Sequence, residues 1–236
     1  MSRATAITFL ATFVIGLAGC GKPAGPDPVA GQVEALKPLK ELDADVEPAE
    51  PTADQPVIRV VLNGEKVNDD AMTYVGRLPK LRLLRLKNTA VTAAGLAKIG
   101  SIVTLDTLDL SGSKKVNDEA LAQIAHLAGL QTLILNDTAV TDAGMDSVAR
   151  LNGLRVLEMV NTAVGDGGAA KLKSLVVLEE LRLEGTKLTD VGLERLSELP
   201  ALKTVYVNGA AVTVTGIEKA HTLRKEQRRP ELNVVQ

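Results

Sequence analysis

The sequence predicts an α/β fold, a right-handed solenoid of about seven βα repeats with a curved parallel sheet on its concave face and helices on its convex face. A leucine opens an L-x-x-L-x-L segment, or a close variant, about every 24 residues, at Leu81, Leu105, Leu130, Leu154, Leu178 and Leu202. Within each unit the apolar period changes from two to that of a helix, which indicates a strand followed by a helix. A unit this short cannot bury its own apolar face, so the units must stack.

The low aromatic content and the net charge of the chain limit the kinds of core and ligand that can be expected. Aromatic residues make up 2% of the chain, so the core must be aliphatic, which suits a stack of repeats. The net charge is -2, whereas phosphate binding needs a concentrated excess of lysine and arginine. Nucleic acid is therefore not expected as a partner.

Residues 1–19 have the pattern of an export signal, in which Arg3 precedes an apolar run and small residues follow it. The run is too short for a comfortable membrane span. Residues 17–20, Leu-Ala-Gly-Cys, resemble the bacterial lipobox, in which the cysteine is lipidated and becomes the mature N-terminus. The resemblance implies that Cys20, the only cysteine, anchors the chain in a membrane. The alternative is an ordinary secretory signal with an incidental cysteine.

The residue after the cysteine is Gly21, whereas lipoproteins kept in the inner membrane usually carry Asp there. The resemblance therefore implies a lipid-anchored protein of the cell envelope, with the outer membrane favoured and the domain facing the periplasm or the cell surface. Residues 20–30 hold the lipidated cysteine and a flexible Pro-rich tether.

Residues 31–56 are predicted to form an N-terminal cap helix and a linker. Apolar residues recur every three positions, at Val33, Leu36, Leu39 and Leu42, which indicates a short amphipathic helix. Such a helix would cover the first apolar layer of the stack. Because Pro38 lies inside it, an unstructured continuation of the tether is the alternative.

Residues 57–236 are predicted to form the repeat domain with a C-terminal cap. One equivalent position in each repeat carries a residue suited to cap a helix N-terminus, at Asn68, Thr92, Asn117, Thr141, Gly165, Thr189 and Thr213. The next position is acidic in five copies, where a carboxylate meets the positive end of the helix dipole, at Asp69, Asp118, Asp142, Asp166 and Asp190.

These motifs, with their T-x-V-T-D-x-G-L core, resemble the leucine-rich repeats of F-box-type proteins and of lipid-anchored envelope proteins of planctomycete-like bacteria. Where that family has Asn or Cys in the turn after the strand, this chain has hydroxyl residues that can make the same local bonds, at Thr89, Ser113, Thr138, Thr162 and Thr186. No F-box is visible, so a ubiquitin-ligase role does not transfer. Residues 230–234 resemble the closing strand of such arrays.

No catalytic, cofactor or metal site is expected. The acidic residues of the repeats lie one repeat apart and lack the pattern of a calcium loop. His126 and His221 have no nearby nucleophile or second ligand, and both are expected at the surface. The glycines at 165–168 lack the lysine of a phosphate-binding loop and suit a variant turn. Nothing supplies a nucleophile with its base, so we do not expect an enzyme.

Alternate strand residues from successive repeats must form ladders on the concave face. Twelve of them define the candidate binding surface, called here the concave surface: Arg59, Arg85, Lys87, Asp109, Ile134, Val156, Glu158, Val160, Glu180, Arg182, Glu184 and Tyr206. An apolar centre between a basic end and an acidic end resembles a protein interface. Equally, Arg85 could pair with Asp109, and Glu158 with Arg182, and so serve the sheet alone.

Basic residues also gather near the C-terminus, at Lys219, Arg224, Lys225, Arg228 and Arg229. They suit a solvated helical cap, with contact to anionic lipid or cell-wall polymer as the alternative. Together the patterns predict a lipid-anchored interaction module whose ligand is an unidentified protein. The alternative is an architectural envelope component that self-associates or contacts the cell wall.

Overall fold

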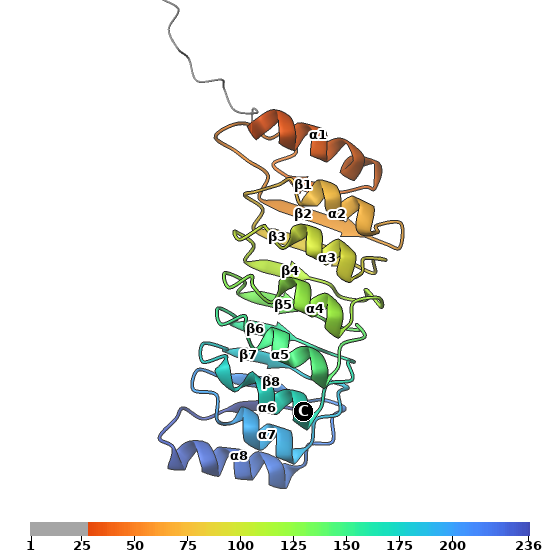
Figure 1. Cartoon of the computed structure of the whole chain (residues 1–236). Coiled ribbons are helices and arrows are strands. Elements are labelled where there is room, and N and C mark those ends of the chain that lie inside the picture. Colours follow the sequence, from red (N-terminus) through yellow and green to blue (C-terminus); the bar gives the residue numbers. More distant parts are fainter. Residues whose placement is uncertain (1–27) are drawn as a thin grey trace, which may run out of the picture.

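The computed structural model describes residues 28–236, which form a single stack of strands and helices (Figure 1). The export signal, Cys20 and most of the expected tether lie outside the described residues. One sheet carries the strands β1 (Asp45–Glu47), β2 (Arg59–Asn63), β3 (Leu83–Lys87), β4 (Thr107–Asp109), β5 (Thr132–Ile134), β6 (Val156–Glu158), β7 (Glu180–Arg182), β8 (Thr204–Tyr206) and β9 (Asn233–Val235) in that order. Strands β2 to β9 are parallel, which confirms the predicted fold class.

All the helices lie along one face of this sheet (Figure 1). They are α1 (Pro28–Glu41), α2 (Asp69–Val75), α3 (Ala93–Ile99), α4 (Asp118–Ile124), α5 (Met145–Val148), α6 (Asp166–Lys171), α7 (Asp190–Leu196) and α8 (Val214–Glu226), with short 3-10 turns at Asp142–Gly144 and Leu172–Ser174. The repeating leucines are fully buried between the two layers, so the core is aliphatic along the whole stack.

The N-terminal end is covered by α1, whose Ala35, Leu36 and Leu39 are buried. The helix passes through Pro38 and begins at Pro28, inside the stretch expected to be tether. Strand β1 follows it and pairs antiparallel with β2. We expected only linker there, because a three-residue strand gives too short a pattern to be read from sequence.

The predicted helix starts are confirmed at all seven positions. Six of these side chains accept a hydrogen bond from a backbone N–H in the first turn, and Gly165 has no side chain to do so. The turn hydroxyls also bond as expected. Thr138, Thr162 and Thr186 each donate to the carbonyl three residues earlier, at 2.6–2.7 Å.

The aspartates that follow the caps bond to the next repeat, a contact that goes beyond the predicted effect on their own helix dipole. Asp166 accepts from the backbone N of Thr189 at 2.8 Å, from its Oγ1 at 2.6 Å and from the N of Gly192 at 2.9 Å. Asp69, Asp118, Asp142 and Asp190 likewise accept from the backbone N of the next cap, and all but Asp142 also accept from its hydroxyl. Each carboxylate thus fastens two repeats together on the helical side; we call this contact the staple.

The staple explains the glycine of the T-D-x-G motif. A Cβ on Gly192 would lie 2.4 Å from Asp166 Oδ1, so only glycine leaves room for the carboxylate. The same holds at Gly95, Gly144, Gly168 and Gly216. One junction differs: Ala93 replaces the aspartate, and the position of the next glycine is Ala120. The two positions therefore change together within this one chain.

One residue in the turn after each strand has a positive φ in all seven repeats, at Gly64, Asn88, Gly112, Asp137, Asn161, Gly185 and Gly209. Glycine, asparagine and aspartate tolerate this left-handed backbone best. The turn lets the chain leave the sheet toward the helical layer.

Candidate functional site

The concave surface is built by the predicted register. Val61, Arg85, Asp109, Ile134, Glu158, Arg182 and Tyr206 are paired in sequence across β2 to β8. Beside them runs the ladder of Arg59, Leu83, Thr107, Thr132, Val156, Glu180 and Thr204. A third ladder begins with Asn63 and Lys87, which pair inside β2 and β3, and continues through Val160 and Glu184, which follow the ends of their strands.

The basic end of the surface is largely neutralised. Arg85 Nε donates to Asp109 Oδ2 at 2.9 Å, as the alternative interpretation predicted, and Lys87 Nζ lies 3.7 Å from the same oxygen. Asp109 is only 2% exposed and also accepts from Ser111 Oγ at 2.5 Å. These cations therefore stabilise a buried carboxylate.

Arg59 is neutralised by strand β1. Its guanidinium lies 2.9 Å from Asp45 and 3.9 Å from Glu47. Both acids face it because β1 pairs residue by residue with β2. Sequence reasoning missed these two residues, since it assigned no strand to this segment.

The acidic end differs from the predicted pairing. Arg182 donates to Glu184 on its own chain segment at 2.6 Å, and its guanidinium lies 4.7 Å from the ring centroid of Tyr206. The hydrogen bond to Glu184 raises the pKa of Arg182. Glu158 instead accepts from Asn136 Nδ2 at 2.7 Å. Glu158 and Arg182 therefore form no ion pair, in contrast to the alternative interpretation, because Glu184 on the same segment binds the guanidinium; Glu158 attracts Arg182 only at longer range.

Ile134, Val156 and Val160 lie half-buried between these two ends. Asn136 orders the turn beside them, since its Oδ1 accepts from the backbone N of Val160 at 2.8 Å. The predicted apolar centre is thus shallow, with polar groups around it.

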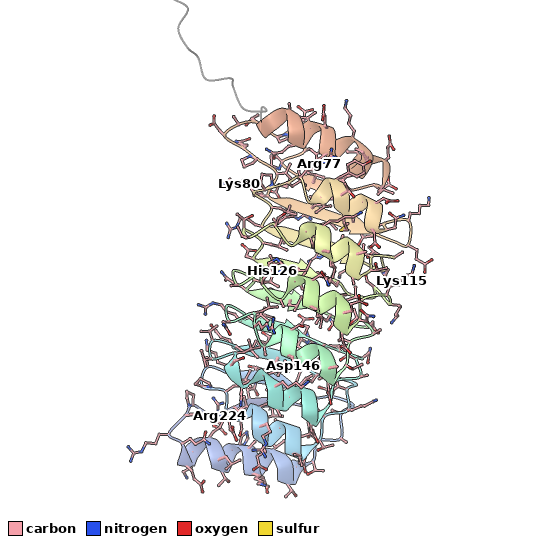
Figure 2. The ribbon with its side chains drawn as sticks, viewed as in Figure 1. Arg77, Lys80, Lys115, His126, Asp146 and Arg224 are labelled. Carbon is pink, nitrogen blue, oxygen red and sulfur yellow. The ribbon has the colours of Figure 1, made fainter. Side chains whose placement is uncertain are left out.

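The basic cluster near the C-terminus is mostly structural. Arg224 lies at the C-terminal end of the stack (Figure 2). It is 1% exposed and donates to the carbonyl oxygens of Pro230, Ser197, Leu199 and Leu202 at 2.7–3.2 Å. Burial lowers the pKa of Arg224. The prediction that Arg224 belongs to a solvated cluster is wrong, because sequence alone does not show that four carbonyl oxygens surround this side chain.

The neighbours of Arg224 are also engaged. Lys219 pairs with Glu194 at 2.6 Å, and Arg229 donates to the carbonyl oxygens of Ser197 and Glu198. The cluster therefore acts as a cap that satisfies the last backbone acceptors of the stack.

Residues 176–197, which span β7 and α7, match the family model described as Leucine Rich repeat. The parallel sheet and the helices on one face are also typical of this kind of repeat. The chain is a leucine-rich-repeat solenoid.

The solenoid resembles solved structures in fold. One is internalin C2 from Listeria monocytogenes str. 4b F2365, with a TM-score of 0.55 and 21% sequence identity, covering 69% of this chain and 76% of that one. No curated protein sequence matches the chain. At this identity the likeness concerns the fold alone.

The two histidines and the glycine-rich turn of the repeats form no further site among residues 28–236. His126 is exposed and its Nε2 lies 2.7 Å from the Gly100 carbonyl, while His221 is half-buried beside the Leu232 carbonyl. Gly165 precedes the first turn of α6, as a variant turn would. Among residues 28–236 no three His, Cys, Asp or Glu side chains gather as metal ligands. Nor is any helix of this part of the leucine-rich-repeat chain long and apolar enough to cross a membrane.

Proposed function

We propose that this chain is a lipid-anchored protein of the cell envelope whose leucine-rich-repeat domain binds another protein on the concave surface. The role is one of binding without catalysis. The anchor is Cys20, with the outer membrane favoured and the domain facing the periplasm or the cell surface.

One observation carries the proposal: within residues 28–236 the helices occupy one face of the sheet only, and the opposite face is left uncovered (Figure 1). That face presents half-buried aliphatic residues among charged ones, a composition typical of protein interfaces. A protein ligand suits it better than a sugar or a base, because Tyr206 is the only aromatic residue on the ladders and its ring lies against Arg182.

The stack also favours binding by its rigidity. Staples at five of the six junctions between successive repeats of the described chain hold the strands in register. A surface that is already ordered loses little conformational entropy when a partner docks.

The test is a crosslinking pull-down from intact envelopes with the native chain and the variants Ile134→Asp and Val160→Arg. Matched controls place the same charges on the helical side, at the exposed Ala97 and Ala170. We expect one partner to be captured by the native chain and both controls, and lost with the concave variants. Circular dichroism confirms that all variants fold.

Identical capture by every variant would contradict binding on the concave surface. If the captured protein were then the chain itself, the architectural alternative would replace the proposal. The anchor is tested separately by Cys20→Ser, which we expect to move the protein from the membrane fraction to the soluble fraction.

A further inference from the structure

The charges on the concave surface do not balance along the stack. In the N-terminal half, three cations face three carboxylates: Arg59, Arg85 and Lys87 against Asp45, Glu47 and Asp109. Because every cation has an acid within ion-pair distance, this half has no net charge to offer a ligand.

The C-terminal half carries an excess of negative charge. Glu158, Glu180 and Glu184 stand against the single cation Arg182, which is a net charge of -2. Arg182 is bound by Glu184 and held against Tyr206. That leaves Glu158 hydrogen-bonded to the neutral amide of Asn136 and attracted by Arg182 beyond ion-pair distance, and Glu180 with no ion-pair partner among residues 28–236.

Cations at the adjacent edge do not compensate this charge. Arg155 and Lys203 are the nearest basic residues in sequence to β6 and β8, and both bind the carboxylate of Glu179. Both cations are therefore engaged by Glu179, and neither forms an ion pair with Glu158 or Glu180 in the part of the chain that the structure describes.

Each of the two remaining carboxylates has an aliphatic neighbour on the preceding strand. The register places Ile134 opposite Glu158, and Val156 opposite Glu180. A lysine or arginine side chain fits such a pair, because its methylene stem packs on the aliphatic group while its charged end meets the carboxylate. The same pair occurs twice on one face.

We infer that the partner presents a basic, extended segment to this half of the concave surface, with two cationic side chains two residues apart. The two carboxylate positions are one strand and two residues apart, which is about 8 Å from strand geometry. Side chains at i and i+2 of an extended segment lie on one face, about 7 Å apart. This inference rests on the proposed function and adds the chemistry of the ligand.

The test uses the full-length chain in detergent and three fluorescein-labelled peptides with the centres Lys-Val-Lys, Glu-Val-Glu and norleucine-Val-norleucine. Fluorescence anisotropy at low salt is expected to show binding of the lysine peptide only. The double variant Glu158→Gln with Glu180→Gln is expected to bind it about tenfold more weakly, since two charge-assisted contacts are lost. The control Glu119→Gln with Glu218→Gln removes the same charge from the helical side and should bind as the native chain does.

Equal weakening in both double variants would show unspecific attraction and overturn the inference, as would binding of the norleucine peptide as strong as that of the lysine peptide. Absence of any lysine-peptide binding overturns it as well. In each case the proposed function is judged apart, by whether the crosslinked partner still depends on Ile134 and Val160.

Discussion

Asp166 in one repeat accepts hydrogen bonds from both the backbone N and the Oγ1 of Thr189 in the next. The carboxylate does not only face its own helix dipole; it also satisfies the N-terminus of the neighbouring helix. The repeat motif is therefore a contact between units, and its residues should be tested in pairs.

Replacing Asp166 by alanine should lower the free energy of unfolding by about 2 kcal/mol, since three donors lose a charged acceptor. Urea unfolding at neutral pH measures the change. As a control, Asp146→Ala removes one exposed ion pair with Lys171 and should change the value by less than about 0.5 kcal/mol. Equal effects at the two sites would refute the staple.

Gly192→Ala should destabilise the fold by about 1 to 3 kcal/mol, because the new methyl group meets Asp166 and Leu188 at 2.4 Å. The double variant with Asp166→Ala should lose less than the sum of the two single effects, as the natural Ala93 and Ala120 pair indicates. A double-mutant cycle in urea gives the coupling. Gly31→Ala is the matched control: it meets nothing within 4 Å, lies inside a helix and should be neutral or stabilising.

Arg224→Ala should destabilise the C-terminal cap by about 3 kcal/mol, because buried carbonyl oxygens lose their donors. Hydrogen exchange should show α8 and β9 losing protection first. Lys225→Ala, an exposed change on the same helix, should leave the protection unaltered. Unchanged exchange in the Arg224 variant would show that the cap does not depend on it.

Stability should fall in acid partly through Asp190. Hydrogen bonds from the backbone N and the hydroxyl of Thr213 lower its pKa below the ordinary 3.8. A lowered folded pKa stabilises the native state above the unfolded pKa, and that contribution disappears as pH falls through the folded pKa. Urea midpoints measured from neutral pH to about pH 3 should therefore fall less steeply below 3.8 in Asp190→Asn. An identical slope in both proteins would contradict the assignment.

Strand register and helix starts could be predicted because the same pattern recurs at equivalent positions in every repeat. The left-handed turn could also have been predicted, since the equivalent position of every repeat holds glycine, asparagine or aspartate. Strand β1 could not, because it occurs once and is three residues long.

The contacts of charged side chains were harder to predict than the pairing of residues across neighbouring strands. Glu158 and Glu184 both lie near Arg182 in the repeat pattern, and only the structure shows that Arg182 forms its ion pair with Glu184. Arg224 looks like its basic neighbours in sequence, although it alone is fully buried among them. The repeat period predicts the backbone position of a side chain, but not the residue that its charged group contacts.

The junction without a staple has a mechanical consequence. Between α3 and α4 no aspartate joins the helices, yet on the sheet side Thr89 Oγ1 lies 2.9 Å from Ser113 Oγ, and Thr89 N donates to the same oxygen. In a linear array each junction contributes its own stiffness. We therefore expect the solenoid to bend at this joint, with the sheet as the pivot and the helices moving apart, so that the part of the concave surface before β4 can change its angle to the rest when a partner binds.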